Sequence, residues 1–456
     1  MIGKVPRELV VRLSWTTSSF GIIQLLRFTN NIILARLLSP PLLGLMLIVN
    51  SIRTGVELLS DVGINQSIVS HRQGHTPEFY DTAWTITAIR GVVLGAFCFA
   101  FAGFFASFFE KPELATVLPV IALTFVFTGF QSASTALLQK QGLVARIATF
   151  EVGVAVLSLA VHVGLALITP TIWALVLGSV ITSGAMLVTS YLVLPGVRHR
   201  FIIDRTSARE IIVFGKWIFL SSIIYFLAMN YDRLYFAKQI PLELLGVYAI
   251  ARSMADMLTM LVNRTSTWVI FPHVASMEST APEVRASLLH SRRTVLLLVA
   301  LSFAIFVAIS DGIIRLLYDA RYETAAEILP LMLLGVWISI LCTVNDSVLL
   351  GMARPAYTAI ANAAKLLTFV VGVPIAFHYY GLMAAIVVLN AGEVVRYVVL
   401  WLFSRRKHLA FGRDDFALTA LFLIATVGIR ELLFASGLAS GIEGLFPFLQ
   451  PETWVR

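Results

Sequence analysis

Residues 152–194 read VGVAVLSLAVHVGLALITPTIWALVLGSVITSGAMLVTSYLVL, a stretch without a single Asp, Glu, Lys or Arg. An α-helix needs about 20 mostly apolar residues to cross the hydrocarbon core of a bilayer. The stretch is long enough for two crossings, and Pro170 lies between them. It therefore predicts two consecutive transmembrane helices, over 143–169 and 171–194.

The rest of the chain repeats this pattern of long apolar blocks separated by short polar gaps. Of its 456 residues, 58% are hydrophobic and only 13% are charged, whereas a soluble globular chain is nearer a quarter charged. A further apolar stretch, 416–437, is a thirteenth span or a helix lying in the membrane interface, and we favour the span. The blocks predict an all-α integral membrane protein with twelve core helices, near 12–37, 42–69, 79–109, 114–138, 143–169, 171–194, 209–237, 242–270, 287–310, 324–350, 355–378 and 380–403.

The basic residues predict how the chain is oriented in the membrane. The net charge is +8, but these residues stand in short gaps between apolar blocks rather than on one exposed face, which argues against a nucleic-acid partner. With the N-terminus inside, the inner connections hold nineteen Lys and Arg; the outer ones hold five, namely Arg36, Lys111, Lys238, Arg315 and Arg321. Both ends of the twelve-helix core are therefore predicted in the cytoplasm, where the basic connections meet anionic membrane lipids.

Two parts of the chain match each other at nearly fixed spacings. A shift of 202 residues places Ala35-Arg36 on Ala237-Lys238 and Leu42-Leu43-Gly44 on Leu244-Leu245-Gly246, and a shift of 211 places Ala115, Leu118 and Pro119 on Ala326, Leu329 and Pro330. Short apolar matches arise by chance, but the same topological positions recur, which favours a duplication. We predict two six-helix lobes, residues 1–200 and 201–404, related by a pseudo-two-fold axis along the membrane normal. A basic connection, the extra helix and a short tail occupy 405–456.

Several segments resemble those of a known family. They are 32–40 (IILARLLSP) with the following Leu43-Gly44, then 60–64 (SDVGI), and finally Tyr318-Asp319 with 321–326 (RYETAA). These resemble the oligosaccharide or O-antigen flippase branch of the multidrug/oligosaccharidyl-lipid/polysaccharide exporter superfamily, over residues 8 to about 405. The related lipid II flippases carry an arginine-bearing motif in the first helix where this chain reads TNNI at 29–32. No residue roles are carried over from that branch.

The resemblance implies a fold and an activity. It implies two lobes around a central cavity, and alternating access that moves an undecaprenyl-diphosphate-linked oligosaccharide outward across the bacterial inner membrane. The product would feed cell-surface polysaccharide such as O-antigen or exopolysaccharide, with a polysaccharide polymerase or glycosyltransferases as partners. We expect no cofactor, and coupling to an ion or to the membrane potential. The chain has no GxxxxGK[ST] phosphate loop, so we do not expect ATP to drive it directly.

Ionisable side chains at membrane depth are the candidate functional residues. Each costs about 2.5–3.5 kcal/mol to insert near the bilayer centre, so it usually faces a bundle interior or a wet cavity. A diphosphate crossing this region needs cations, because guanidinium groups bind phosphate through paired hydrogen bonds. We therefore predict a cationic, substrate-binding cavity formed by Arg27, Arg53, Arg252, Arg264, Arg90 and Lys365.

Acidic residues near these cations are the candidates for coupling or gating, namely Glu57, Asp256 and Asp346. Glu57 and Asp256 each stand four residues after an arginine, the spacing of an ion pair along one helix. Glu393 and Arg396, three residues apart, are interpreted as a self-neutralising pair that stabilises helix packing.

Two other functions remain open. A multidrug and toxin exporter would share the architecture, but such exporters use acidic residues at membrane depth, whereas the embedded charges here are mainly cationic. A polytopic glycosyltransferase, polymerase or ligase would carry substantial outer loops, and here the outer connections are only a few residues long. The sequence also contains no HExxH or CxxC motif, so we expect a carrier rather than an enzyme.

Overall fold

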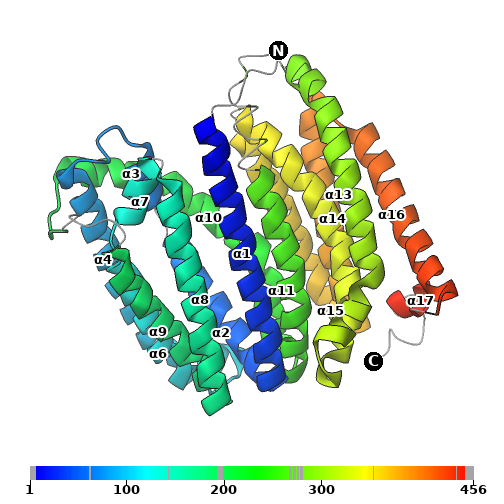
Figure 1. The fold of residues 1–456 in the computed structure, drawn as a ribbon, viewed down its shortest axis with the longest axis horizontal. Coiled ribbons are helices and arrows are strands. Elements are labelled where there is room, and N and C mark those ends of the chain that lie inside the picture. The colour runs from blue at the N-terminus through cyan, green and yellow to red at the C-terminus, as the bar shows by residue number, and fades with distance from the viewer. Residues whose placement is uncertain are drawn as a thin grey trace. The chain divides into compact units, whose positions relative to one another are not determined.

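The fold is entirely helical in the residues that the computed structural model describes, which are 7–60, 63–141, 143–192, 199–266, 270, 274, 277, 281–352, 354–437 and 439–446 (Figure 1). In this part of the chain nine helices are long and apolar enough to cross a membrane, or ten if one bent pair counts as a span. The predicted all-α membrane fold is confirmed. The number of twelve core helices plus one, and the symmetry between the lobes, remain predictions.

The chain divides into two compact units. Unit 1 comprises residues 1–226 and 233–246. Its helices are α1 (Arg7–Leu37), α2 (Pro40–Leu58), α3 (Ile64–Ser70), α4 (Pro77–Ala100), α5 (Ala102–Phe109), α6 (Leu114–Gly129), α7 (Ser134–Lys140), α8 (Val144–Ile168), α9 (Ile172–Ser190) and most of α10 (Arg205–Gln239). Unit 2 comprises residues 227–232 and 247–456. It contains most of α11 (Leu242–Thr265), then α13 (Ala281–Leu317), the 3₁₀ turn η2 (Ala320–Tyr322), α14 (Glu323–Gly351), α15 (Pro355–Arg406), α16 (Gly412–Ala435) and α17 (Ile442–Leu445). The predicted division at residues 200 and 404 remains a prediction.

Three of the predicted spans in unit 1 are each two helices. The span 79–109 is divided into α4 and α5, and 114–138 into α6 and α7, which meet at a bend of 45°. The span 42–69 is divided into α2 and α3, and Gly63, just before α3, has a φ of 62°. Since this is the left-handed region that favours glycine, Gly63 allows the chain to turn between the two helices.

The two glycines of the Leu-Leu-Gly repeat meet within unit 1. A Cβ atom added to Gly44 would lie 2.2 Å from the backbone oxygen of Leu242, and one added to Gly246 would lie 1.9 Å from that of Pro40. Small residues let helix backbones approach closely in a membrane. The repeated glycines are therefore explained by a contact that admits no side chain on either partner.

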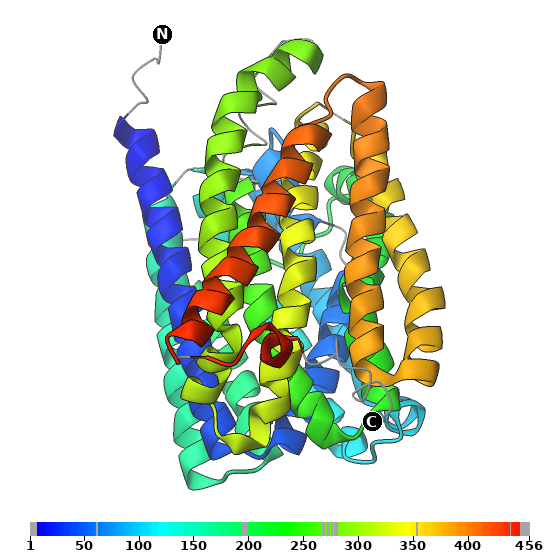
Figure 2. The ribbon, with the colours of Figure 1, turned by 90° about the vertical axis from the view of Figure 1, so that its right-hand side faces the viewer.

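Helix α15 has 52 residues, and a straight helix of that length would be about 78 Å long, more than twice the thickness of a hydrocarbon core. It is folded at Gly381, whose φ of 77° and ψ of −165° are not helical. Figure 2 shows its two halves (yellow and orange) running side by side and joined at one end. These halves correspond to the predicted spans 355–378 and 380–403.

Buried ion pairs join α16 to α13 near both ends of α16. The aspartate is on α16 in one pair and on α13 in the other. Near the start of α16, Asp415 contacts Arg292 of α13 at 2.7 Å. Near the ends of both helices, Asp311 of α13 accepts hydrogen bonds of 2.8 Å from both terminal nitrogens of Arg430 on α16. The predicted segment 416–437 therefore packs one face against unit 2, and its helix is long and apolar enough to span a membrane.

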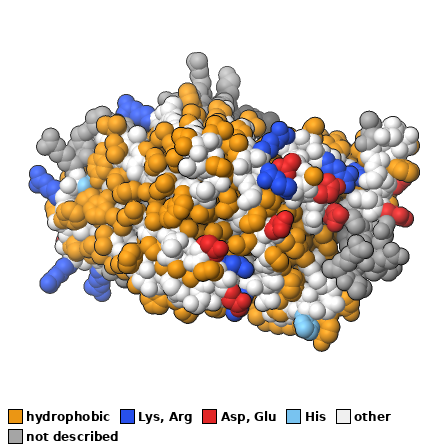
Figure 3. Space-filling view, turned by 90° about the horizontal axis from the view of Figure 1, so that it is seen from below, with side chains coloured by type: hydrophobic (Ala, Val, Ile, Leu, Met, Phe, Trp, Pro, Cys, Tyr) orange, Lys and Arg blue, Asp and Glu red, His pale blue; other side chains and the backbone are white. Residues whose placement is uncertain are grey.

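Large hydrophobic side chains cover much of the protein surface. Leu25, Ile168 and Leu432 are more than 60% exposed, and even in the view from below (Figure 3) hydrophobic side chains (orange) lie between the charged ones. An apolar surface of this extent would be unfavourable in water. It is the surface expected of helices that face lipid tails.

Candidate functional site

A pocket inside unit 2 is lined by five ionisable residues, namely Asp232, Arg252, Asp256, Lys365 and Glu393. It has a volume of about 80 Å³ and is lined by side chains from α10, α11, α14 and both halves of α15. Its ionisable residues connect to two more charged side chains. We call the whole set the unit 2 charge cluster; its members are Asp232, Arg252, Asp256, Asp346, Lys365, Glu393 and Arg396.

Two cations of the cluster lie well inside helices that are long and apolar enough to span a membrane. Arg252 stands ten residues after the start of α11, and Lys365 stands ten residues after the start of α15. At 1.5 Å per residue each lies about 15 Å along its helix, which is half of a typical hydrocarbon thickness. Both side chains line the pocket. Such charges are expensive in the bilayer and commonly mark a substrate or ion pathway.

Arg252 is held between two carboxylates. Its Nη1 atom lies 3.3 Å from Asp232 Oδ2, and its Nε atom lies 3.1 Å from Asp256 Oδ1. Asp232 also accepts a hydrogen bond from the hydroxyl of Tyr248. The i,i+4 spacing of Arg252 and Asp256 thus corresponds to a real ion pair, and the second carboxylate comes from another helix.

Lys365 begins a chain of four alternating charges. Its Nζ atom donates to Glu393 Oε1 at 2.5 Å, across the fold of α15. The other oxygen of Glu393 lies 3.5 Å from Arg396, which also forms an ion pair with Asp346 of α14. Glu393 and Arg396 are therefore not the self-contained pair that the sequence suggested. They link Lys365 in the pocket to Asp346, because two further partners on neighbouring helices lie within reach.

The cations of the unit 2 charge cluster are compensated. The cluster contains three cations, Arg252, Lys365 and Arg396, and each contacts at least one carboxylate. The sequence prediction gave Asp256 and Asp346 a coupling or gating role and Glu393 a packing role, and it did not place any of these carboxylates in the cationic cavity. An incoming anion would have to replace a carboxylate as the partner of a cation, since burying an additional uncompensated charge is expensive.

The predicted residues of unit 1 are arranged differently. Arg90 donates to Ser60 Oγ at 3.0 Å and to the Glu57 backbone oxygen at 2.6 Å, so it adds a side-chain donor at the end of α2, where a helix leaves carbonyl groups exposed. Arg90 and Glu57 line a second pocket, of about 270 Å³. Arg53 is half-buried and, within the described residues, forms no ion pair with Glu57, while Arg27 lies exposed on α1.

Of the six predicted cations, only Arg252 and Lys365 line the same pocket among those described. Arg264 is half-buried on α11 and is not among the lining residues of that pocket. Sequence reasoning also missed Asp232. The signal was present, because Asp232 is a carboxylate inside the predicted span 209–237 and should have counted among the charges at membrane depth.

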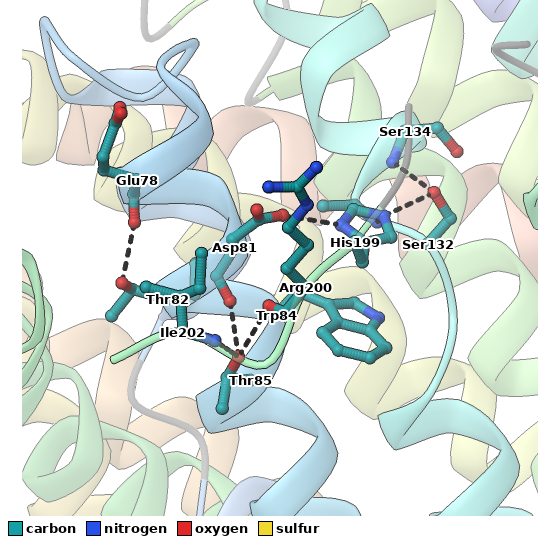
Figure 4. A network of polar contacts seen from close by, with 12 residues as sticks. Glu78, Asp81, Thr82, Trp84, Thr85, Ser132, Ser134, His199, Arg200 and Ile202 are labelled. Atoms are coloured by element: carbon teal, nitrogen blue, oxygen red, sulfur yellow. Dashed lines mark hydrogen bonds and ion pairs between the residues drawn. The ribbon is translucent and has the colours of Figure 1, made fainter. Parts of the chain in front are cut away.

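A second polar network attaches the connection before α10 to α4 (Figure 4). The ring of His199 is buried, with Nδ1 3.4 Å from Asp81 and Nε2 2.9 Å from Ser132 Oγ. It stacks on Trp84 with ring centroids 5.1 Å apart. Burial lowers the pKa of His199, and the nearby Asp81 opposes this shift. The rings of Tyr80, Trp84 and Tyr191 surround His199. We therefore interpret this network as one that stabilises the fold rather than as a binding site.

The same connection is held through its backbone. Thr85 Oγ1 accepts a hydrogen bond from Ile202 N at 3.2 Å, and Thr82 Oγ1 accepts one from Asp204 N at 3.0 Å. Asp204 then caps α10 by accepting from Ser207 N at 2.7 Å, which lowers the pKa of its carboxyl group. The start of α10 is therefore fixed to the N-terminal part of α4.

Comparison with known proteins identifies the family. A model of the family described as "Polysaccharide biosynthesis protein" matches residues 33–327, which is more than half of the chain. The chain belongs to this polysaccharide biosynthesis protein family. The match covers α2 to α13. Of the two cations in the unit 2 pocket, Arg252 lies inside the matched range and Lys365 lies beyond it.

Individual relatives of this family member are distant in sequence. The chain is 22% identical to the lipopolysaccharide biosynthesis protein WzxC of Escherichia coli (78% of this chain, 72% of WzxC) and 24% identical to the amylovoran biosynthesis protein AmsL of Erwinia amylovora (86% and 99%). It is 22% identical to the teichuronic acid biosynthesis protein TuaB of Bacillus subtilis (65% of this chain). The match spans 62% of the length of TuaB.

Solved structures confirm the predicted superfamily fold. The lipid II flippase MurJ in an inward closed conformation aligns with a TM-score of 0.76 at 12% identity, over 96% of both chains. An inward-facing multidrug resistance transporter of the MATE family aligns with a TM-score of 0.65 at 13% identity, over 90% of this chain and 99% of that one. This family member therefore has the fold of the multidrug/oligosaccharidyl-lipid/polysaccharide exporter superfamily.

Proposed function

We propose that this chain is a flippase that moves an undecaprenyl-diphosphate-linked oligosaccharide from the cytoplasmic to the outer leaflet of the inner membrane, by alternating access. The observation that carries the proposal is the pair of cations at mid-membrane, Arg252 and Lys365, that line one pocket in a member of a polysaccharide biosynthesis family. A lipid diphosphate is the part of such a substrate that most needs a polar partner within the bilayer.

The pocket suggests how the charge is handled. About 80 Å³ holds a few water molecules, so the glycan itself must occupy space outside the pocket. In the proposed cycle, diphosphate oxygens take the place of Asp256 at Arg252 and of Glu393 at Lys365. The released carboxylates then need a compensating proton or metal cation, which would couple transport to an ion gradient. No covalent step is required of the protein.

The test compares a variant that loses only the Lys365 charge with one that loses the charges of both Lys365 and Glu393. A deletion strain would carry the wild type, Lys365→Gln, or Lys365→Gln combined with Glu393→Gln, with Arg146→Gln at an exposed site as the control. We expect surface polysaccharide to fall at least tenfold in both Lys365 variants, because a charge-assisted hydrogen bond contributes about 1.5–3 kcal/mol. Lipid-linked oligosaccharide should accumulate on the cytoplasmic leaflet, with normal amounts of protein in the membrane.

The double variant separates binding from packing. If Lys365 only compensates the buried charge of Glu393, the double variant regains stability and also export. Restored export would therefore refute the role of Lys365 in binding the substrate. Normal export in the single variant would do the same.

A cation-coupled drug exporter is the second candidate, and the carboxylates favour it. Asp232, Asp256 and Glu393 line the same pocket as the cations, and carboxylates would bind a cationic drug. This candidate predicts that the deletion strain becomes sensitive to cationic drugs and keeps its surface polysaccharide. The flippase proposal predicts the reverse.

A further inference from the structure

A groove in unit 2 lies apart from the charge cluster, at the end of the unit where α16 begins. It has a volume of about 820 Å³ and lies between α14, the second half of α15 and α16. We call it the α15–α16 groove. Its walls are mainly apolar, and its charged lining residues are Arg285, Arg405, Arg413 and Asp415.

The apolar walls are held in place by packing that does not fill the groove. Trp337 of α14 donates to Thr419 Oγ1 of α16 at 3.0 Å and stacks on Phe422. Beyond this contact, Phe416 of α16 is 78% exposed and Val394 of α15 is 46% exposed, and both line the groove. The helices are thus fixed relative to one another, with an open apolar channel between them that is accessible from the side.

The cations are gathered at the basic end of the groove. Arg285 Nε donates to the Ala410 backbone oxygen at 2.9 Å, and the Arg405 guanidinium lies 5.3 Å from the ring centroid of Trp401. Arg413 is exposed in the first turn of α16. Within the described part of the chain, neither Arg405 nor Arg413 contacts a carboxylate.

The single carboxylate in the lining does not neutralise this end. Asp415 Oδ1 is paired with Arg292 at 2.7 Å, and its Oδ2 accepts from the hydroxyl of Tyr397 at 2.8 Å. Its charge is therefore already compensated inside the core. Asp414, in the same turn of α16, does not line the groove. Three guanidinium groups thus face an apolar channel with a net positive charge at its mouth.

We propose that the α15–α16 groove binds an anionic diacyl phospholipid of the cytoplasmic leaflet. Its phosphate lies between Arg405, Arg413 and Arg285, and one acyl chain lies against Phe416 and Val394. Arg405 and Arg413 belong to one connection that the charge distribution predicts in the cytoplasm, and Arg285 belongs to another. Basic pockets between transmembrane helices on that side bind anionic lipid head groups, which are abundant there. This site is independent of the proposed transport reaction.

The test uses Trp401 as a reporter, because it lines the groove. Purified full-length protein would be reconstituted in phosphatidylcholine vesicles containing rising fractions of brominated phosphatidylglycerol, whose bromine atoms quench nearby tryptophan. The difference between the wild type and Trp401→Phe isolates the groove signal. We expect the quenching of Trp401 to saturate at low fractions of brominated phosphatidylglycerol. With brominated phosphatidylcholine at the same fractions, we expect no saturable quenching.

Two charge variants separate a specific site from general basicity. Arg405→Gln with Arg413→Gln removes two groove cations, and Arg406→Gln with Lys407→Gln removes two equally exposed cations of the same connection that do not line the groove. The first pair should raise the half-saturating fraction at least tenfold, since each cation near the surface contributes about 1 kcal/mol. The control pair should change it less than threefold.

Val394→Phe keeps every arginine, adds no tryptophan and fills the apolar wall, so it should also weaken the saturable quenching. Equal effects of the two arginine pairs, equal quenching by brominated phosphatidylcholine, or no effect of Val394→Phe would each refute the proposal. Displacement of phosphatidylglycerol by a tenfold smaller amount of undecaprenyl phosphate would also refute it, because the occupant would then be a polyprenyl lipid.

Discussion

Arg430 has no exposed surface, and its terminal nitrogens donate hydrogen bonds of 2.7 to 2.8 Å to Ala308, Asp311 and Ser440. Two nitrogens bind the two oxygens of Asp311, and one of them also donates to the Ala308 backbone oxygen. Planar, paired bonds of this kind are the strongest that a protein makes to a carboxylate. Each charge is tolerated inside the bundle only because the other is present.

We therefore expect Arg430→Met to be strongly destabilising. It leaves Asp311 buried with only Arg315, at 3.7 Å, as a charged partner, and breaking a buried ion pair costs about 3–5 kcal/mol. Thermal unfolding of the purified protein in detergent would measure the loss. Arg430→Met combined with Asp311→Leu should recover most of it, because no unpaired charge remains.

The exposed pair of Arg321 and Asp319 is the matched control, with nitrogen and oxygen 2.6 Å apart. Arg321→Met should change the free energy of unfolding by at most about 1 kcal/mol, as exposed ion pairs do. If Arg430→Met is as mild as this control, the buried pair does not stabilise α16.

The sequence predicted the members of the charge cluster better than their contacts. Arg252, Asp256, Asp346 and Lys365 were all identified, because an ionisable residue inside an apolar block stands out by its cost. The pairing of Lys365 with Glu393, and of Asp346 with Arg396, was not predicted. A sequence gives the depth of a residue along its helix, whereas a partner on another helix depends on helix rotation and on packing.

Helix α15 illustrates what a sequence predicts about an element. The apolar blocks 355–378 and 380–403 predicted its two halves, and the turn between them is at Gly381. The breaks between α2 and α3 and between α4 and α5 were missed. In the second case residues 97–105 are almost entirely apolar across the break, so hydropathy carries no signal there.

Gly381→Ala should destabilise the turn in α15. A side chain at a φ of 77° and a ψ of −165° occupies a region that is essentially confined to glycine, and strain there costs about 1–3 kcal/mol. Gly428→Ala in α16 is the control, since a Cβ atom added there meets nothing within 4 Å and its φ is not positive. That change should be neutral or stabilising by up to about 1 kcal/mol. Equal melting temperatures for the two variants would contradict this account.

At the scale of the whole molecule, the distribution of basic residues predicts a topology that can be measured directly. The two native cysteines, Cys98 and Cys342, are both buried, so a single new cysteine can be labelled against a low background. In spheroplasts, a membrane-impermeant maleimide should react with Lys111→Cys without permeabilisation. It should react with Arg146→Cys only after the membrane is opened. The opposite pattern would invert the predicted orientation.

The internal repeat shows how far sequence reasoning reaches at this scale. Matching positions such as Gly44 and Gly246 were found by their spacing, and the structure supplies the reason for those glycines in the close approach of two backbones. A duplication remains the interpretation that we favour. The sequence match between the two Leu-Leu-Gly segments does not show which helix surfaces are in contact, because leucine side chains can pack in many arrangements.

The ion pairs that join α13 to α16 have a consequence for membrane insertion. Arginine is on α13 at one end and on α16 at the other, with the aspartates placed conversely. If α16 entered the bilayer upside down, Arg430 would face Arg292 and Asp415 would face Asp311. Like charges would then meet at both ends in a medium that screens them poorly. The last long helix can therefore dock in one direction only, and a misinserted chain would be left with an undocked helix that quality-control proteases could recognise.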